Sequence, residues 1–428
     1  MKDNFLLLLL VLLTFATKAQ VEQISLVEKG GQMKLVVDDA DFMINGMNWD
    51  YFPIGTNYDY SLWEQPKRVI KAALKVEMTA LQKMGVNAIR QYNKIPPQWI
   101  KYIYKKYGIY TMLNHPFGRY GLSVDGEWMA NTDYADPRVE KALLAEVTDM
   151  VAQYKGTPGL LMYLLGNENN YGLSWEGAET EDIPKEDEET ARRAVFMYKA
   201  FNKAALAIKA ADGSLPVAIC NGDLVFIELV AEFCPDFDIY GTNMYRGVSF
   251  GDAFQRVKEE LNMPILFTEF GADAFNTVKK VEQQKPQAYY MVGNWKEIYE
   301  NTAGLGKAGN ALGGFTFQFT DGWWKFGQTR NLEVHDDNAS WSNGGYQEDF
   351  AEEGFNNMNE EWFGICAKGE TNKKGVYQIH PRAAYYALKE VHQYQVFQKN
   401  ASLESIQNHF DQISIETALK QAKGPKKK

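Results

Sequence analysis

Apolar and polar residues alternate along the chain in blocks that predict strands followed by helices. Residues 160–165 form an unbroken apolar run, which is typical of a parallel strand buried on both faces. Residues 136–154 predict a helix, because Asp136 stands at the preferred cap position and Pro137 at the first helical position. Blocks of this kind recur along the chain and predict parallel strands joined by helices.

Eight strand–helix pairs are predicted. The strands cover residues 43–51, 86–91, 109–114, 160–165, 216–220, 238–243, 264–268 and 313–320. The helices that follow them cover residues 66–84, 97–106, 136–154, 188–211, 224–233, 250–261, 286–301 and 380–394. This number of units favours an α/β fold of the closed (β/α)8 TIM-barrel type over an open doubly wound sheet.

Long connections follow strands 4 and 8, at residues 174–189 and 321–374. Both lie on the face where barrel enzymes place their sites. The second connection contains Trp323, Trp324, Trp341 and Trp362, too many large rings for a disordered linker. We therefore expect it to form a wall of the functional site.

The remaining segments define the domain organisation. Residues 1–19 have the pattern of a signal peptide: Lys2, an apolar run from residue 5, and small residues ending at Ala19. The run is shorter than the roughly 20 residues of a membrane-spanning helix, so we expect a secreted protein without membrane insertion after cleavage. Residues 20–41 predict a strand pair turned at Gly30-Gly31, residues 42–400 the barrel domain, and residues 401–428 a mobile tail.

Composition excludes some functions. The formal net charge of −10 argues against nucleic acid as a partner, because phosphate binding depends on clustered Lys and Arg. The five His and three Cys show no metal-ligand spacing, and no nucleotide fingerprint stands in a credible context, so neither metal nor cofactor is expected. Cys220 and Cys234 either form a disulfide or are buried small residues.

Two apolar strands end in a carboxylate. Residues 164–170 read Leu-Leu-Gly-Asn-Glu-Asn-Asn around Glu168, and residues 265–271 read Ile-Leu-Phe-Thr-Glu-Phe-Gly around Glu269. The ends of strands 4 and 7 face one bowl of a barrel, so the two carboxyls can meet there. Cleavage of a glycosidic bond needs such a pair, one protonating the leaving oxygen and the other attacking or activating water. A lone Glu at a strand end more often forms a salt bridge or helix cap, but the pair favours catalysis.

The motifs around these strand ends resemble those of the catalytic TIM barrel of glycoside hydrolase family 2, within the clan of retaining glycosidases with catalytic Glu on strands 4 and 7. The resemblance runs from about residue 42 to 391. It rests on Gly-Val-Asn-Ala-Ile-Arg at 85–90, Gly-Asn-Glu at 166–168, Asn-Met-Tyr at 243–245 and Thr-Glu-Phe-Gly-Ala-Asp at 268–273.

The resemblance implies a role for each matching residue. Glu168 would be the acid/base and Glu269 the nucleophile, with Arg90 beneath the nucleophile and Tyr245 bonded to it. Asn167 would contact the sugar 2-hydroxyl, and Asn243 lies in the strand-6 motif. The chain departs from the family pattern at Phe317, where a Trp is usual, and in lacking space for two β-sandwich domains between residues 20 and 41.

Further substrate-binding candidates come from the strand ends alone. Asn48, followed by Trp49 and Asp50, ends strand 1 and would face the bowl. His115 after strand 3 would bind a sugar hydroxyl, with a packed or capping His as its alternative. Trp323 and Trp324 suit a stacking platform for a sugar ring, and loop anchoring is their alternative.

These observations predict an enzyme that hydrolyses β-linked poly- or oligosaccharides with retention. A transglycosylase would use the same residues and pass the glycosyl unit to another sugar. A non-catalytic carbohydrate-binding barrel is the third hypothesis, although it would be expected to lack one of the two carboxylates, and this chain has both.

Overall fold

Eight parallel strands close into a barrel in the computed structural model, which describes residues 22–422 except 93–94, 175–187, 278, 325–326 and 339–357. The barrel strands are β4 (Ile44–Asn48), β5 (Ala88–Gln91), β6 (Tyr110–His115), β9 (Leu160–Leu165), β10 (Val217–Gly222), β11 (Ile239–Asn243), β12 (Ile265–Phe270) and β15 (Ala311–Thr316). The predicted TIM barrel is therefore confirmed, with strand 4 as β9 and strand 7 as β12. The predicted signal peptide at residues 1–19 lies outside the described part.

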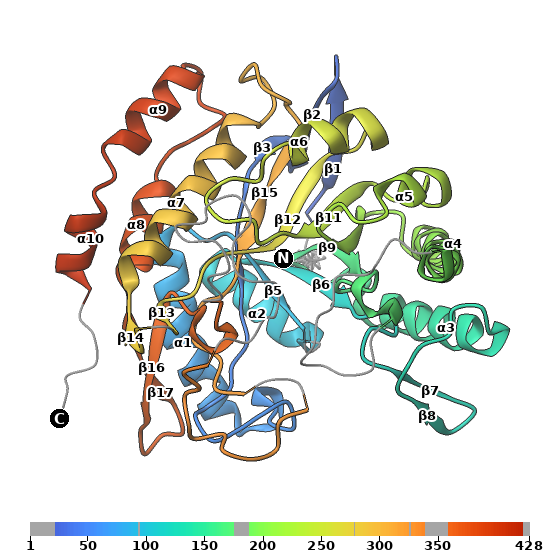
Figure 1. The fold of residues 1–428 in the computed structure, drawn as a ribbon, viewed down its shortest axis with the longest axis horizontal. Coiled ribbons are helices and arrows are strands. Elements are labelled where there is room, and N and C mark those ends of the chain that lie inside the picture. The colour runs from blue at the N-terminus through green and yellow to red at the C-terminus, as the bar shows by residue number, and fades with distance from the viewer. Residues whose placement is uncertain are drawn as a thin grey trace, which may run out of the picture.

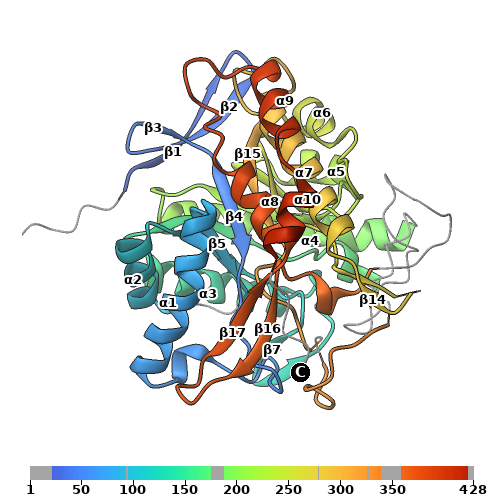
Figure 2. The same cartoon turned by 90° about the vertical axis from the view of Figure 1, so that its left-hand side faces the viewer.

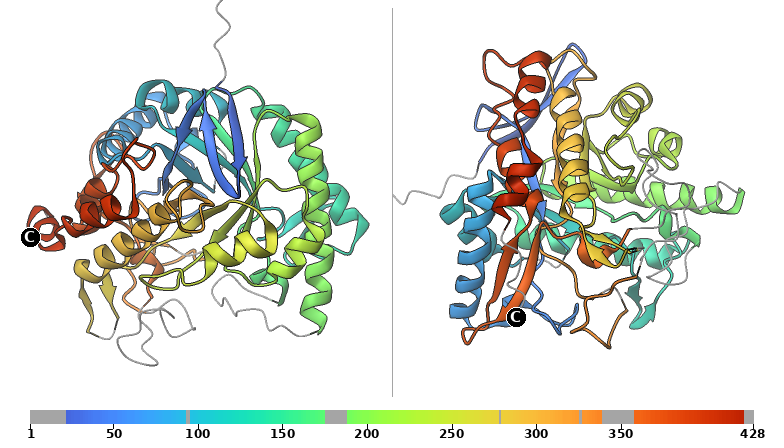
Figure 3. Two further views of the ribbon diagram at one scale, coloured as in Figure 1. Left: turned by 90° about the horizontal axis from the view of Figure 1, so that it is seen from above. Right: turned by 60° about the vertical axis from the view of Figure 1, so that its left-hand side comes forward.

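Helices form an outer layer around these strands (Figures 1 and 3). They are α1 (Lys67–Met84), α2 (Pro97–Tyr107), α3 (Pro137–Tyr154), α4 (Glu188–Ala211), α5 (Ile227–Phe233), α6 (Ala253–Arg256), α7 (Gln284–Glu300) and α8 (Ala383–Val391). The cap predicted for the third helix is present, since the carboxylate of Asp136 accepts a hydrogen bond from the Arg138 amide at 2.8 Å. Helix α6 continues as a π-helical turn over Val257–Leu261.

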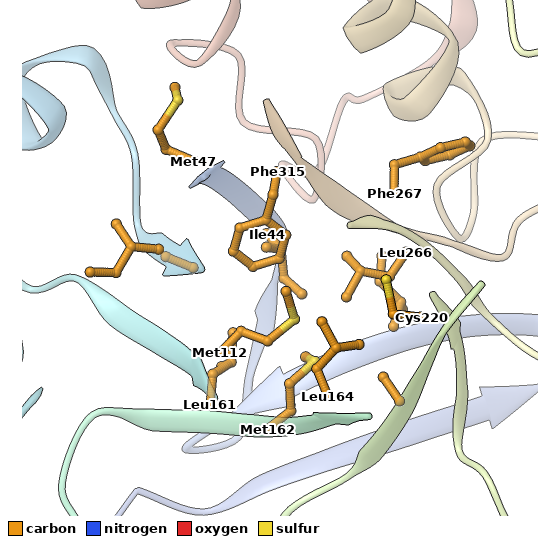
Figure 4. Close-up of a cluster of buried hydrophobic side chains, with 14 of the residues drawn as sticks. Ile44, Met47, Met112, Leu161, Met162, Leu164, Cys220, Leu266, Phe267 and Phe315 are labelled. Atoms are coloured by element: carbon orange, nitrogen blue, oxygen red, sulfur yellow. The ribbon is translucent and has the colours of Figure 1, made fainter. Parts of the chain in front are cut away.

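The barrel interior is filled by apolar side chains from many strands. Figure 4 shows Ile44, Met112, Leu164 and Phe315 gathered in one cluster, and all four are fully buried. A Cβ atom at Gly46 would lie only 2.4 Å from a ring carbon of Phe315, so glycine at this position makes room for the ring. The barrel is thus a packed core that holds its strand ends rigidly.

A small antiparallel sheet precedes the barrel. The predicted strand pair is present as β1 (Ile24–Lys29) and β2 (Gln32–Val37), and a third strand, β3 (Ala40–Phe42), joins it. Leu35 of β2 is fully buried, and the Met33 amide donates to the Gly309 carbonyl at 2.8 Å just before β15. Figure 2 shows this sheet at the end of the molecule opposite the hairpin β16–β17. It therefore covers the amino ends of the strands.

The connection after strand 8 contains the hairpin of β16 (Cys366–Thr371) and β17 (Tyr377–Pro381). The helix predicted from residue 380 begins only at Ala383, because Pro381 disfavours helical backbone at His380. Residues 339–357 of this connection, including Trp341, lie outside the described part, as do residues 175–187 after strand 4. Shorter elements are η1 (Leu62–Glu64), β7 (Leu122–Val124), β8 (Glu127–Met129), η2 (Tyr171–Ser174), β13 (Phe275–Asn276), β14 (Val281–Glu282) and η4 (Glu360–Trp362).

The prediction of a mobile tail after residue 401 is wrong for residues up to 422. Helices α9 (Leu403–Asp411) and α10 (Ile415–Gln421) pack against α7 and α8. Ser402 begins α9 with a capping box, and the ring of Phe410 lies 5.8 Å from that of Tyr299. The cap and the buried apolar face together order this segment.

All three cysteines are buried and free, so the disulfide alternative for Cys220 and Cys234 is excluded. None of the described helices combines the length and the apolar character that a membrane span requires.

Candidate active site

A cavity of about 380 Å³ opens at the carboxyl ends of the barrel strands. Residues from many strand ends and loops surround it. Its lining includes Asp50, Tyr92, Asn114, Tyr120, Asn167, Glu168, Tyr245, Glu269, Gln318, Trp324 and Lys368. The barrel thus brings together the two carboxylates singled out in the sequence.

Both oxygens of the Glu269 carboxylate are held by donors. Arg90 donates from Nη1 to Oε1 at 2.8 Å, and Tyr92 donates from its hydroxyl to the same oxygen. The hydroxyl of Tyr245 donates to Oε2 at 2.9 Å. A charged partner and two phenols therefore stabilise the ionised carboxylate and fix its orientation.

The two phenols are suited to act as donors. Burial raises the pKa of Tyr92 and of Tyr245 well above the usual value, and the negative charge of Glu269 raises both further. Both hydroxyls therefore keep their protons at neutral pH.

Arg90 is fully buried and links several parts of the site. Its Nε atom donates to Asn114 Oδ1 and its Nη2 atom to Asn167 Oδ1, each at 2.8 Å. Its Nη1 atom also donates to the Thr268 carbonyl at 3.2 Å. The guanidinium thereby ties the ends of β5, β6 and β9 to β12.

Glu168 is positioned by a neutral amide. Asn243 donates from Nδ2 to Glu168 Oε1 at 2.9 Å and to Asn167 Oδ1 at 3.1 Å. The hydroxyl of Thr268 donates to Asn243 Oδ1 at 2.7 Å, which sets the orientation of that amide. The backbone of Glu168 has a φ of 58°, a left-handed conformation that is uncommon outside glycine.

An irregularity in β12 places two consecutive side chains in the site. Thr242 of β11 pairs with Phe267, whereas the next residue, Asn243, pairs with Glu269, so Thr268 has no partner in the register. In a regular strand, neighbouring side chains point to opposite faces. Here Thr268 and Glu269 both contact residues of the site.

Three of the predicted substrate-binding residues lie behind the carboxylates and do not line the cavity: Arg90, Asn48 and Asn243. The amide of Asn48 donates to the Thr268 and Phe315 carbonyls at 3.0 and 3.1 Å, and its oxygen accepts from Tyr92 at 3.1 Å. These three side chains contact Glu269, Tyr92 and Glu168 from outside the cavity lining.

The position of His115 favours the packed or capping alternative over contact with a sugar. Its Nδ1 atom accepts from the Phe117 amide at 3.1 Å, and its Nε2 atom lies 3.6 Å from a carboxylate oxygen of Glu146 on α3. The side chain does not line the cavity, whereas the preceding Asn114 does. Alternation along β6 explains the difference, because adjacent residues face opposite sides of a strand.

The tandem tryptophans have different environments. Trp324 lines the cavity and packs edge-on against Phe52 at 5.1 Å. Trp323 stacks on His335 at 4.5 Å, and His335 stacks in turn on Trp362 at 3.8 Å. The platform interpretation thus fits Trp324, and the anchoring alternative fits Trp323.

Tyr92 and Lys368 line the cavity but were not singled out from the sequence. Tyr92 follows Arg90 by two residues at the end of strand 2, a position that could have identified it. Lys368 lies in β16, inside a connection whose pattern carried no strand signal.

The described ranges within residues 22–422 contain no group of three His, Cys, Asp or Glu side chains arranged to hold a metal ion.

An eight-stranded barrel with two glutamates facing one cavity at its carboxyl end defines the architectural class of the glycosidase barrels. The family model "Glycosyl hydrolases family 2, TIM barrel domain" matches residues 35–302, more than half of the chain. The chain belongs to this family, as the motifs around Glu168 and Glu269 predicted.

Solved structures show the same fold. A family 2 β-galacturonidase from Eisenbergiella tayi bound to galacturonate is 14% identical, with a TM-score of 0.52. A β-D-glucuronidase for Dictyoglomus thermophilum is also 14% identical, with a TM-score of 0.54; each match covers 87% of this chain and 54% of the other. A β-glucuronidase from Bacteroides uniformis is 12% identical, with a TM-score of 0.53 over 84% of this chain and 36% of the other.

The chain therefore spans about half the length of the first two proteins and just over a third of the length of the third. A comparison with curated protein sequences finds no match.

Proposed function

We propose that this protein is a retaining glycosidase that cleaves β-glycosidic bonds of a poly- or oligosaccharide. The observation that carries the proposal is that two glutamates face one cavity at the carboxyl ends of the barrel strands. Glu269 accepts hydrogen bonds from Arg90, Tyr92 and Tyr245, and the contacts of Glu168 include a hydrogen bond from Asn243. A pair of facing carboxyl groups suits one nucleophile and one proton donor.

The proposed reaction has two steps. In the first, Glu269 attacks the anomeric carbon and Glu168 protonates the departing glycosidic oxygen, which leaves a covalent glycosyl-enzyme. In the second, Glu168 takes a proton from water, and the water oxygen displaces Glu269 from the anomeric carbon. Two inversions at that carbon give net retention.

The roles of the two carboxylates can be separated with azide. A Glu168→Ala variant acting on an aryl β-glycoside should form the glycosyl-enzyme and then yield the β-glycosyl azide. A Glu269→Gly variant should yield the α-glycosyl azide instead, because azide then replaces the nucleophile. Proton NMR of the products distinguishes the two anomers.

The reverse pairing of variants and anomers would exchange the two roles. Full activity of Glu269→Gln would refute the proposal altogether. Products longer than the substrate would identify transglycosylation by the same residues.

The sugar site is proposed to include Asn167, Tyr245 and Trp324, which all line the cavity. The amide of Asn167 donates to the Tyr120 hydroxyl at 2.7 Å, and the amide oxygen accepts from Arg90 at 2.8 Å. An Asn167→Ala variant should lose more activity on a 2-hydroxy substrate than on its 2-deoxy counterpart. Equal losses on both would remove the assignment to the 2-hydroxyl.

Export is proposed on the pattern of residues 1–19, where Lys2 precedes an apolar run and small residues end at Ala19. Mass spectrometry of the protein from an exporting host should show a mature chain that begins at Gln20. An intact Met1 in the exported fraction would contradict cleavage there.

A further inference from the structure

Asp50 and Lys368 lie in the cavity of the proposed active site, although neither belongs to the network that holds the two glutamates. Asp50 follows the end of β4, and Lys368 comes from β16 in the connection after strand 8. Two segments far apart in the sequence thus bring a carboxyl group and an ammonium group to the same cavity.

Both groups have unused hydrogen-bonding capacity. The Oδ1 atom of Asp50 is buried and has no hydrogen-bond partner. Lys368 is 8% exposed, and its ammonium lies 5.4 Å from the centre of the Tyr377 ring. Within the described ranges, Lys368 forms no ion pair or side-chain hydrogen bond. Buried polar groups in native proteins are nearly always paired, so unpaired ones that line a cavity point to a ligand.

The surrounding charge restricts what that ligand can be. Burial raises the pKa of Asp50 to about 8, and the negative charge of Glu269 adds to the rise. Glu77, Asp321 and Asp50 lie close enough to Lys368 to oppose the lowering of its pKa by burial. A sugar carboxylate bound to Lys368 would therefore enter a site already surrounded by acidic groups. A hydroxyl group avoids this repulsion.

A sugar hydroxyl also matches both groups chemically. One hydroxyl can accept a hydrogen bond from the Lys368 ammonium and donate its own proton to Asp50 Oδ1. Two neighbouring hydroxyls on one pyranose ring can divide these roles between them.

We infer that Asp50 and Lys368 recognise hydroxyl groups of a neutral pyranose beside Glu269, and that they select against uronic acids. The inference rests on the proposed glycosidase function. It sets this chain apart from the β-galacturonidase and β-glucuronidase structures that share its fold.

The first experiment compares aryl β-glycosides in matched pairs: glucoside with glucuronide, and galactoside with galacturonide. Mannosides and soluble β-glucans extend the neutral set. Activity counts only where the Glu269→Gln variant abolishes it. We expect kcat/KM for the neutral member of a pair to exceed that for the uronide by at least about 10-fold.

The second experiment uses Asp50→Asn and Lys368→Met. Lys368→Met should lower kcat/KM on the neutral substrate by about 10- to 100-fold, the range expected for a hydrogen bond to a charged group, and Asp50→Asn should lower it by about 3- to 10-fold. Exposed residues of the same loops supply matched controls, Asp59→Asn and Lys373→Met, which should retain wild-type kinetics. Thermal melting of all four variants separates a binding defect from a folding defect.

Deoxy substrates distinguish a sugar-binding role of Asp50 from a purely structural one. The 3-, 4- and 6-deoxy analogues are compared on wild type and on Asp50→Asn. For at least one analogue, the kcat/KM values of wild type and Asp50→Asn should agree to within about twofold, because that analogue lacks the hydroxyl that Asp50 is inferred to bind. A purely structural role would lower kcat/KM on every analogue by the same factor, and that result would overturn the inference.

The remaining outcomes separate this inference from the proposed function. Glu269-dependent activity confined to uronides would overturn the inference and leave the glycosidase function intact. Neutral activity that is unchanged in both Asp50→Asn and Lys368→Met would do the same. Absence of Glu269-dependent activity on every substrate would overturn both.

Discussion

Arg90 and Glu269 form a buried ion pair, with Nη1 and Oε1 2.8 Å apart and the arginine side chain fully buried. The pair joins the second barrel strand to the seventh. The same guanidinium also donates to Asn114 and Asn167. The orientation of the Glu269 carboxylate therefore depends on the placement of both amides.

Replacing Arg90 with Met should damage both stability and activity. Removing one partner of a buried ion pair leaves an uncompensated charge, which costs about 3–5 kcal/mol. Denaturant unfolding should show this loss, and kcat/KM should fall by more than about 100-fold. Arg68→Met, at an exposed position of α1, is the control. A fall in stability without a fall in kcat/KM of the folded fraction would show that activity does not depend on the contact of Arg90 with Glu269.

Removing the hydroxyl of Tyr245 should lower activity without unfolding the protein. Tyr245→Phe deletes the donor to Glu269 Oε2 and keeps the ring. A hydrogen bond to a charged group contributes about 1.5–3 kcal/mol, so kcat/KM should fall by roughly 10- to 150-fold. The exposed Tyr289→Phe serves as the control. Activity within twofold of wild type would mean that Arg90 and Tyr92 suffice to hold the carboxylate.

The adjacent tryptophans should give opposite phenotypes. Trp324→Ala should raise KM with little change in melting temperature, because Trp324 lines the cavity. Trp323→Ala should destabilise the fold by about 2 kcal/mol, because it removes a ring stacked on His335. Steady-state kinetics and thermal melting on both variants test the pair. Identical effects on KM would show that both rings contact the sugar.

The contribution of His392 to stability should fall in mild acid. Burial lowers the pKa of this side chain to about 3, whereas in the unfolded chain it is about 6.5. The unfolded state therefore binds a proton between these pH values and the folded state does not. The contribution of His392 to the free energy of unfolding should therefore drop by about 1.4 kcal/mol per pH unit below pH 6.5, or about 2 kcal/mol at pH 5.

The measurement is urea unfolding at pH 7 and pH 5. The free energy of unfolding of wild type minus that of His392→Gln should be about 2 kcal/mol lower at pH 5 than at pH 7, with His409→Gln in α9 as the control. A difference that does not change between the two pH values would show that His392 takes up no proton on unfolding in this range.

The apolar runs predicted the barrel because a parallel strand buried on both faces has few alternatives in sequence. Glu168 and Glu269 were predictable for the same reason, since each ends such a run. The direction of each side chain was not predictable, because a shift of one residue along a strand turns a side chain to the opposite face. Asn114 lines the cavity, and the next residue, His115, does not. The position of Lys368 was not predictable from the sequence, because its place in the same cavity as Asp50 depends on a hairpin far from β4 along the chain.

The left-handed backbone at Glu168 has a cost in folding stability. With a φ of 58°, this residue keeps its Cβ close to the following carbonyl, a conformation that glycine adopts without strain. Two inactive variants, Glu168→Gly and Glu168→Ala, both lack the carboxylate, but only the glycine relaxes the backbone, and it should melt at the higher temperature of the two. The carboxylate at position 168 is thus held in place at a cost in stability that a glycine would not carry.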